Sequence, residues 1–572
     1  MKKTAVAIAL LFSGLSLASV FPPLQTAVAD NGLAIWFALV PLFWLIRRDT
    51  PRQAFFHSFS VGAIFWTITL SWFPAIIKNN GPWPLVLLGW AGLAAWCSLF
   101  FGIYGAAAAM VWQWAGKTHG WRRIATIAVI EPLLWAGAEW VRSWLFTGFA
   151  WNFLGVGLVN NLPLIQISSV FGVYGASALV VLGNSAIASM AERTFGPIWR
   201  RFHREEIFRP SLRERTAHGL ESLIPFVLII TAWGFGLRTQ STDARIPKEP
   251  WLVALIQPNA PCVFESTPEL VSQQFNALRE QTTLAARIKP DLMVWPETST
   301  PGPVPFRKGV TDFLADCLKN GSSPLLTGTT EEAMSTPTRD NPQGIIYYNS
   351  AWLFSPDGVP IGAYRKQHLV PFGEYVPFDK TFPVLQRLAP TGVSCYAGTN
   401  PSVMTLTNVT HESALRIGPL ICFEDTVAAL SRNAVNAGAN VLALMTNDAW
   451  FNRSCEPLQH QQQAVFRAVE NRVPMIRAAN SGVTCTVSAI GKVEALQSDG
   501  RSYDFNGYLT SRIYVDRRHS PTPYTRCGDW TLGIPGAVFI VGIGICGTVR
   551  RRREKRQSKT STFGDHREQT TA

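Results

Sequence analysis

The chain has 572 residues, of which 47% are hydrophobic and only 16% are charged, and it contains 21 tryptophans. So little charge with so many tryptophans indicates several membrane spans with aromatic anchors at the interface, and argues against a purely soluble protein. The formal net charge is +13, but the basic residues flank apolar runs and no nucleic-acid motif is present, so we expect no nucleic-acid partner.

The cysteines argue against a metal or redox centre. Their number is odd, their spacing is irregular and no CxxC pair occurs, so we expect no metal site and no cofactor. An odd number also requires that at least one thiol stays free or pairs between chains. The nine are Cys97, Cys262, Cys317, Cys395, Cys422, Cys455, Cys485, Cys527 and Cys546.

Eight apolar segments are predicted to span a membrane, because a spanning helix needs about 20 apolar residues. The first has an alternative interpretation as part of a cleaved signal peptide, since Lys2 and Lys3 precede it and Ala27-Val28-Ala29 follows it. The eight segments are residues 4–20, 33–46, 61–77, 84–114, 124–140, 162–191, 223–237 and 532–549.

Positive charge alternates between the loops that join these segments. Every second loop, and the tail after the last segment, is rich in lysine and arginine, whereas the alternate short loops hold little positive charge. By the positive-inside rule both termini are cytoplasmic, and the long region before the last span lies outside the cytoplasm. We expect spanning helices with short loops over 1–238, an outer domain over 239–530, a last span over 531–549 and a basic, disordered cytoplasmic tail over 550–572.

One predicted span carries two charges. Glu139 and Arg142 lie three residues apart and so share a helix face. Charges within a membrane are costly and often functional, so the two residues are either part of a functional site or a structural pair near the outer boundary. The residues that follow, 147–152, are predicted to form an outer loop with interfacial aromatic side chains.

The outer region alternates strand and helix patterns. Strands are predicted at apolar runs such as 251–257, 291–295, 414–421 and 441–445, and helices at 270–288, 426–437 and 458–471. Continuous apolar strands separated by helices imply sheets that are covered by helices. The predicted fold class is therefore a multi-pass α-helical membrane bundle joined to an α/β extramembrane domain.

Polar side chains directly follow three of the predicted strands. Glu297, Cys422 and the pair Asn447-Asp448 each come immediately after an apolar run. In layered α/β folds such strand ends meet at one edge, where active sites are built. We therefore expect these residues to lie close together, while Lys366 lies between two predicted turns.

Cys422 is the candidate nucleophile. It stands at a predicted strand-to-helix junction, where a helix N-terminus lowers a thiol pKa and offers N–H donors to an oxyanion. Glu297 is a candidate general base, and Lys366 is a candidate for stabilising a developing negative charge. Each also has a plainer interpretation, as a buried structural cysteine, a solvated carboxylate and an exposed lysine. His368 leaves a Cys-His dyad open as a further alternative.

Together these residues resemble the nitrilase superfamily of carbon–nitrogen hydrolases, whose members use a Glu-Lys-Cys triad on an α-β-β-α sandwich. The match lies in W-P-E at Glu297, Y-R-K-Q-H-L at Lys366 and I-C-F-E-D at Cys422. More specific strings resemble the apolipoprotein N-acyltransferase family, the membrane branch of that superfamily. They are T-G-F-A-W (147–151), Y-R-K-Q-H-L-V-P-F-G-E-Y-V-P (364–377), N-D-A-W-F (447–451), P-L-Q-H (457–460), R-A-V-E-N-R (467–472), N-S-G (480–482) and G-D-W (528–530).

The resemblance implies a reaction and a role for each residue of the triad. Glu297 would be the general base, Lys366 would stabilise the tetrahedral oxyanion, and Cys422 would carry an acyl chain as a thioester, with ping-pong kinetics. The acyl donor would be a phospholipid of the membrane. The acceptor would be the N-terminal amine of a diacylglyceryl-cysteine apolipoprotein.

Three further residues are expected to support the site: Glu374, Phe423 and Glu424. Phe423 departs from the family, which usually has tyrosine there, so any role of a hydroxyl at this position is lost. The apolar residues 382–385 are a candidate lid or membrane-contacting arm, or a surface loop packed on the domain. The family further implies a monomer in the bacterial inner membrane, with the catalytic domain on the periplasmic side. The alternatives are a membrane-tethered amidase or nitrilase acting on a small amide, and a non-catalytic transporter or scaffold.

Overall fold

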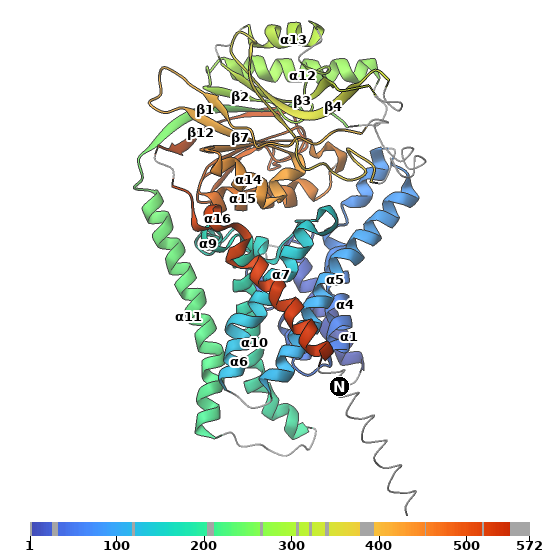
Figure 1. The fold of residues 1–572 in the computed structure, drawn as a ribbon, viewed down its shortest axis with the longest axis vertical. Helices are drawn as coiled ribbons and strands as arrows, with labels where there is room; N and C mark the ends of the chain where they lie inside the picture. Colours follow the sequence, from blue (N-terminus) through green and yellow to red (C-terminus); the bar gives the residue numbers. More distant parts are fainter. Residues whose placement is uncertain are drawn as a thin grey trace, which may run out of the picture.

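The molecule has two halves, a bundle of long helices and a pair of stacked sheets, as the computed structural model shows (Figure 1). The candidate lid at 382–385, the tail at 550–572 and Ala27-Val28-Ala29 lie outside the described residues. The structure describes residues 3–25, 32–79, 81–116, 120–202, 211–262, 267–304, 308–319, 323–337, 342–377, 394–451, 453–517 and 520–549.

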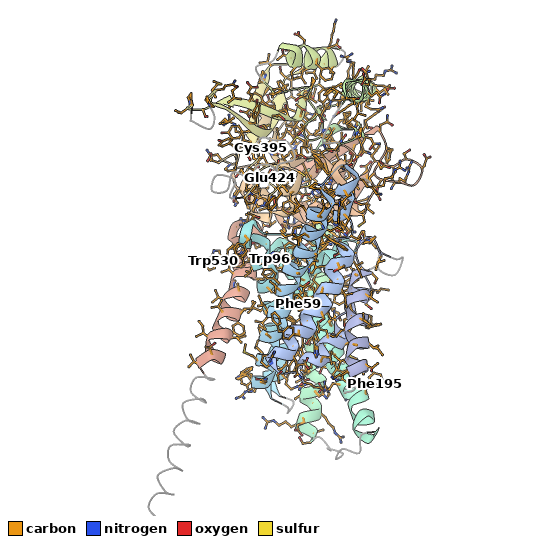
Figure 2. The ribbon with its side chains drawn as sticks, turned by 90° about the vertical axis from the view of Figure 1, so that its right-hand side faces the viewer. Phe59, Trp96, Phe195, Cys395, Glu424 and Trp530 are labelled. Atoms are coloured by element: carbon orange, nitrogen blue, oxygen red, sulfur yellow. The ribbon has the colours of Figure 1, made fainter. Side chains whose placement is uncertain are left out.

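The bundle contains helices that can cross a membrane. Among the described residues, six are long and apolar enough: Pro51–Asn79, Trp83–Ala115, Trp121–Thr147, Val173–Gly196, Leu212–Asp243 and Pro523–Val549. Three further apolar helical segments are shorter: Lys3–Ala18, Ala34–Ile46 and Leu162–Phe171. The predicted multi-pass bundle is confirmed, although the first two of the eight predicted spans fall on the shorter segments. In Figure 2, Trp96 and Trp530 lie at the end of the bundle next to the sheets, where aromatic anchors of a membrane interface are expected.

Local sequence signals set several helix boundaries in the bundle. The Thr50 side chain accepts a hydrogen bond from the backbone of Gln53, whose side chain accepts one from the backbone of Thr50, and Pro51 occupies the first turn. This capping box fixes the start of α4. The helices are α1 (Lys3–Ala18), α3 (Val40–Ile46), α4 (Pro51–Thr69), α5 (Trp83–Ala115), α6 (Trp121–Ala125), α7 (Glu131–Trp144), α8 (Leu162–Ile165), α9 (Ser168–Phe171), α10 (Val173–Phe202) and α11 (Leu212–Asp243).

The prediction of one continuous span over 162–191 is wrong. The helices α8 and α9 are short, and α9 ends at Gly172, whose φ of 67° suits glycine. A β-carbon at Gly172 would lie 2.6 Å from the ring of Tyr524. The close approach of these two chain segments, which hydropathy does not register, separates α9 from α10 and leaves α10 as the span.

The second half is a sandwich of two sheets between two layers of helices. One six-stranded sheet has the order β12-β1-β2-β3-β4-β5 and the other the order β11-β10-β9-β8-β7-β6. Figure 1 shows α12 and α13 on the outer side and α14 and α15 on the side that faces the bundle. The elements are β1 (Lys248–Gln257), α12 (Pro268–Ala286), β2 (Leu292–Val294), α13 (Lys308–Leu318), β3 (Leu325–Met334), β4 (Ile345–Phe354), β5 (Pro360–Arg365), β6 (Met404–Leu406), β7 (Leu415–Ile421), α14 (Ala428–Asn436), β8 (Val441–Thr446), α15 (Glu456–Asn471), β9 (Met475–Ala479), β10 (Cys485–Val487), β11 (Val493–Ala495), β12 (Gly507–Asp516) and α16 (Pro523–Cys527).

The apolar strands of this half are buried because both sheet faces are covered. β7 and β8 pair in parallel, and every residue of β8 is buried. Side chains from both sheets, including Val294 and Ile417, form one core between them. The predicted α/β extramembrane fold is therefore confirmed, and its carboxyl-end edge is where the candidate site residues lie.

The side chain of Gln459 on α15 fixes the sandwich to the bundle. Its Oε1 accepts hydrogen bonds from Trp151 Nε1 at 2.7 Å and from Trp72 Nε1 at 3.1 Å. Its Nε2 donates to the carbonyl oxygens of Pro22 and Thr69. Gln459 is fully buried, so several separate parts of the bundle depend on this one amide.

Gln459→Leu is expected to lower the free energy of unfolding by about 2–5 kcal/mol, because it leaves two buried indole N–H groups without a partner. The loss should appear as a lower midpoint of thermal unfolding of the detergent-solubilised protein, followed by tryptophan fluorescence. Gln461→Leu, at a half-buried position on the same helix, is the control and should change the midpoint little. An unchanged midpoint in Gln459→Leu would show that these hydrogen bonds do not hold the halves together.

Glu139 and Arg142 on α7 shape the chain segment that follows their helix. Glu139 Oε1 accepts a hydrogen bond from the backbone N–H of Leu154 at 2.7 Å. Arg142 donates to the carbonyl oxygens of Phe149 and Trp151 at 2.6 and 2.8 Å. These contacts favour the structural interpretation of the two charges, since they hold in place the loop that meets the sandwich.

Candidate active site

The carboxyl ends of β2, β7 and β8 bring three polar segments together. Glu297 follows β2 through Trp295-Pro296, Cys422 follows β7 directly, and Asn447 follows β8 directly. The backbone N–H of Asn447 donates to Glu297 Oε2 at 3.0 Å, which joins the two sheets at this point. Figure 2 shows Glu424, two residues after Cys422, close to the junction with the bundle.

Lys366 and Glu297 form a buried ion pair. Lys366 Nζ lies 3.6 Å from Glu297 Oε1 and 2.9 Å from Glu374 Oε2. Burial lowers the pKa of Lys366, but the carboxylates of Glu374 and Glu297 outweigh it and raise the pKa above its ordinary value. The structure places Lys366 inside the site with 1% of its surface exposed, which contradicts the plainer interpretation of an exposed lysine.

The two carboxylates beside Lys366 have different environments. Burial raises the pKa of Glu297, and the charge of Lys366 opposes this only in part. Burial also acts to raise the pKa of Glu374, but there the shorter contact to Lys366 outweighs it and the pKa is lowered. Asn349 on β4 donates from Nδ2 to Glu297 Oε1 at 2.8 Å and to Glu374 Oε1 at 2.7 Å. Glu297 is thus the better proton acceptor, while Glu374 stays ionised beside the ammonium group.

Cys422 opens the short 3-10 helix η7 (Cys422–Thr426) in a left-handed backbone conformation, with φ of 51°. A residue other than glycine in this region costs about 1–3 kcal/mol, and such sharp turns present a nucleophile at a strand end. Burial and the charge of Glu297 raise the pKa of the Cys422 thiol well above its ordinary value. The prediction that a helix N-terminus lowers this pKa is wrong, because η7 is short and α14 starts only at Ala428. The resting thiol is neutral and needs a base.

The carboxylate of Glu424 links the Cys422 turn to the Lys366 loop by hydrogen bonds. Its Oε2 accepts a hydrogen bond from the backbone of Ile421 at 2.8 Å, and its Oε1 accepts one from the backbone of Gln367 at 2.7 Å. The Tyr364 hydroxyl donates to the same carboxylate at 2.9 Å. Burial raises the pKa of Glu424 to about 7, against the charge of Lys366. These partners are all donors, so the ionised carboxylate holds them best.

An aromatic stack joins the neighbour of Cys422 to the bundle. The ring of Phe423 stacks on Trp151, with centroids 6.1 Å apart and planes at 7°, and also on Phe149 at 6.1 Å. The ring of His368 stacks on Phe423 at 6.0 Å. This placement makes His368 a packing partner and gives the Cys-His alternative no support. Aromatic side chains from both halves therefore pack around the residue next to Cys422.

The sequence matches known families along most of its length. Residues 13–186 match the family model described as the apolipoprotein N-acyltransferase N-terminal domain, and residues 252–514 match the carbon-nitrogen hydrolase model. An apolipoprotein N-acyltransferase of Geobacter metallireducens is 33% identical over 493 residues, which cover 85% of this chain and 86% of that protein. The chain belongs to the apolipoprotein N-acyltransferase family.

Other members of the apolipoprotein N-acyltransferase family match comparable lengths. The protein of Allorhizobium ampelinum is 30% identical over 488 residues, which cover 80% of this chain and 82% of that protein. The protein of Shewanella oneidensis is 26% identical, with 93% of this chain and 95% of that protein covered. A solved amidase of Nesterenkonia AN1 from the nitrilase superfamily covers 49% of this chain, at 15% identity and a TM-score of 0.34. The family predicted from the motifs is confirmed by the sequence relatives.

Among the described residues, one group of side chains has ligand atoms close enough together to hold a metal ion. Asp448, Glu456 and His460 offer ligand atoms within 4.8 Å of one another. Both ring nitrogens of His460 already contact carboxylates, and Arg477 pairs with the second oxygen of Asp448. The cationic side chains already neutralise the aspartates, so the group forms an ion-pair network rather than an open metal site.

Several residues of the site were missed by sequence reasoning. Asn349 stands in the strand-like run I-I-Y-Y-N-S-A-W, where an amide among apolar residues was the available signal. Tyr364 and Gln367 flank Lys366 and contact Glu424, but nothing in their spacing indicates that contact, which arises between the edges of two different sheets.

The rate of the reaction is expected to fall as the pH is lowered through about 7, because Glu424 then becomes neutral and holds its donors less strongly. The raised pKa sets the sign, since the carboxylate is charged above this pH and protonated below it. Glu424→Gln, which is neutral at every pH, should lose the part of this acid limb that Glu424 causes and keep the part caused by protonation of the candidate base Glu297, whose pKa burial also raises. The variant should be about 10- to 100-fold slower on the alkaline side, as expected for lost bonds to a charged group. Steady-state rates of acyl transfer, measured from acid to alkaline pH, test this prediction. An unchanged acid limb in the variant would assign the limb to another group.

Proposed function

We propose that this protein transfers an acyl chain from a phospholipid to the N-terminal amine of a diacylglyceryl-cysteine apolipoprotein. Cys422 is the nucleophile, Glu297 the general base and Lys366 the charge that stabilises the oxyanion. The observation that carries the proposal is the buried ion pair of Lys366 and Glu297, whose Nζ and Oε1 atoms lie 3.6 Å apart. This pair lies beside the neutral thiol of Cys422, and the next residue, Phe423, stacks on Trp151 of the bundle. The names of the family relatives supply the acceptor, an apolipoprotein that is acylated on nitrogen, whereas the phospholipid donor is what the family resemblance implies.

In the first half of the reaction the acyl chain moves to the protein. Glu297 takes the proton from Cys422 Sγ while the sulfur attacks the ester carbonyl carbon of the phospholipid. The ammonium group of Lys366 stabilises the oxyanion of the tetrahedral intermediate. As the intermediate collapses, the ester C–O bond breaks, the departing alkoxide takes the proton from Glu297, and a lysophospholipid leaves. The acyl group stays on Cys422 as a thioester.

In the second half the acyl chain moves to the lipoprotein. The free α-amine attacks the thioester carbonyl carbon, and Glu297 accepts the proton that the nitrogen loses. Lys366 again stabilises the oxyanion. The C–S bond then breaks, the sulfur of Cys422 takes the proton back from Glu297, and an amide is formed. Because the lysophospholipid leaves before the amine reacts, the kinetics are ping-pong.

The proposed location is the bacterial inner membrane, with the catalytic domain on the periplasmic side and both termini in the cytoplasm. The alternation of basic loops supports this orientation. The proposed parts are the helices over 1–238, the nitrilase-like domain over 239–530, the last span over 531–549 and the cytoplasmic tail over 550–572. We further propose that the protein acts as a monomer, since one chain supplies every residue of the triad.

A small-amide hydrolase would use the same triad but has no need of a site built against membrane helices. Trp151 and Phe149, which come from the bundle, stack directly on the residue after Cys422. This contact favours a substrate that is delivered from the membrane. Acyl transfer is therefore preferred to hydrolysis of a small amide.

The test is mass spectrometry of the purified membrane protein after incubation with phospholipid vesicles. We expect an acyl mass on the peptide that contains Cys422, removable by hydroxylamine, together with release of lysophospholipid. Addition of a diacylglyceryl lipopeptide should discharge the adduct and yield the N-acylated lipopeptide. An adduct that water alone discharges would indicate a lipase, and turnover of a small amide without any acyl adduct would favour the amidase.

A further inference from the structure

A network of buried charged side chains lies behind the Cys422 turn. His460 Nε2 contacts Asp425 Oδ1 at 2.9 Å, and its Nδ1 contacts Asp448 Oδ1 at 3.1 Å. Arg477 reaches the other oxygen of each aspartate, at 3.3 Å for Asp425 and 2.8 Å for Asp448. Each of these four residues has no more than 2% of its surface exposed. Two cations and two carboxylates thus form a closed ring without solvent.

The charges in this ring balance. Burial lowers the pKa of His460, but Asp425 and Asp448 outweigh it and raise the pKa to about 10, so the imidazole is a cation at neutral pH. Three further ionisable groups among the described residues face the ring. The Oε1 of Glu456 lies 3.5 Å from His460 Nδ1, the buried Cys485 thiol faces Arg477, and Arg467 lies near Asp425 but pairs with Glu470. Burial and the charge of Asp448 raise the pKa of Glu456 well above its ordinary value, so it adds no charge. The indole of Trp151 packs against the imidazole at 5.5 Å.

This ring contacts both turns that carry the proposed chemistry. Asp425 belongs to η7, the turn that Cys422 opens. On the other side, the Thr446 hydroxyl donates to Asp448 Oδ1 at 2.7 Å, and the negative charge of Asp448 adds to burial in raising the pKa of the Cys422 thiol. Asn447, between Thr446 and Asp448, donates its backbone N–H to Glu297. Asp425 therefore lies in the turn that carries the nucleophile, and Asp448 lies next to the residue that contacts the base.

We propose that His460 is a positioning residue of the reaction, whose positive charge joins the nucleophile turn to the base turn and cancels the aspartate charge behind the Cys422 thiol. The proposal rests on Cys422 as the nucleophile of the proposed function. The side chain touches no reacting atom and acts through Asp425 and through Asp448 with Thr446. Its neighbour Gln459 holds α15 to the bundle, so the same helix carries the contact with the membrane half and the alignment of the site.

The electrostatic part of this role predicts opposite effects for two variants. His460→Gln removes a cation and leaves a carboxylate uncompensated, which raises the pKa of the nearby thiol. Asp425→Asn removes a carboxylate and leaves a cation in excess, which lowers the pKa of the same thiol. A purely structural role would change both variants in the same direction, because both lose the hydrogen bond between the two side chains.

The experiment measures alkylation of Cys422 by iodoacetamide in the full-length, detergent-solubilised protein, quantified on the Cys422 peptide at several pH values. This readout does not need acyl transfer, so it separates failure of this inference from failure of the proposed function. At neutral pH we expect the alkylation rate to fall on the order of 10-fold in His460→Gln and to rise on the order of 10-fold in Asp425→Asn, with the pH profiles displaced to higher and lower pH respectively. Gln461→Leu on the same helix should match the wild type.

Two results would overturn the proposal. One is a pair of variants that shift in the same direction, and the other is a wild-type profile in both. Should His460→Gln fail to fold, as judged by size-exclusion chromatography, Asp425→Asn decides alone, and a slower or unchanged alkylation rate in that variant rejects the role. Acyl transfer measured on the same preparations should fall about 100-fold in His460→Gln, the loss expected when reacting groups are misplaced by about 1 Å.

Discussion

Cys422→Ala is expected to reduce acyl transfer by at least ~10⁴-fold and to abolish the acyl adduct, because the proposed covalent intermediate forms on this thiol. The sharpest control is Cys262→Ala. Cys262 Sγ lies 4.0 Å from the amide nitrogen of Asn447, and burial with the charge of Glu297 raises the pKa of this thiol to about 12. It is thus a second thiol near the proposed base, and removing it should leave the rate within about threefold of the wild type.

The measurement is N-acylation of a diacylglyceryl lipopeptide in phospholipid vesicles, followed by mass spectrometry. Equal amounts of folded protein, checked by size-exclusion chromatography, make the comparison valid. If Cys262→Ala lost the adduct while Cys422→Ala retained it, the nucleophile would have to be reassigned. If both variants retained full turnover, neither Cys422 nor Cys262 would be the nucleophile.

Glu297→Gln is expected to lower the rate about 10²- to 10⁴-fold, the range typical of a lost general base. The amide oxygen can still accept a hydrogen bond from Asn349, and Lys366 keeps its contact with Glu374, so most of the site should keep its shape. The amide NH2 cannot accept the backbone N–H of Asn447, so that one hydrogen bond is lost. The Cys422 thiol has a raised pKa and would then depend on the solvent for deprotonation. The residual rate of the variant should therefore rise about tenfold for each unit of pH, following the thiolate fraction.

The pH dependence separates a base from a merely structural carboxylate. A Glu297→Gln protein with a low rate but an unchanged pH profile would indicate that the carboxylate shapes the site without moving a proton. Glu412→Gln is the matched control, since Glu412 is an exposed carboxylate of the same domain that pairs with Arg517. That variant should keep both the rate and the profile of the wild type.

The edge of the sandwich that holds the site could be predicted from the sequence. Glu297, Cys422 and Asn447 each follow a run of apolar residues that is long enough for a buried strand, and parallel strands end at a common edge. What could not be predicted was the burial of Lys366. Its neighbours in the chain are polar, and its burial depends on Glu297, from the segment after β2, and on Glu374, from a later turn of its own loop.

The two wrong predictions, of one span over 162–191 and of a lowered pKa for the Cys422 thiol, share a physical cause. Both depend on contact between segments that are distant in the chain. The break at Gly172 follows from the approach of Tyr524, more than three hundred residues later. The raised pKa of the Cys422 thiol follows from burial and from the charge of Glu297, neither of which a local strand-to-helix pattern reports. Hydropathy and motif spacing describe the chain along its length, whereas these features depend on packing across it.

The hydrogen bonds of Gln459 and the stacking of Phe423 on Trp151 determine whether the sandwich can work without the helical bundle. Severing the chain between Asp243 and Lys248, where α11 passes into β1, and again before the last span would not release a working soluble enzyme. The freed sandwich would present the amide of Gln459 and the ring of Phe423 to water. The exposed aromatic ring would promote aggregation, and the amide would lose its partners in the bundle. We therefore expect the smallest active unit to be the sandwich together with the helices of the bundle, because the bundle supplies the contacts of Gln459 and Phe423.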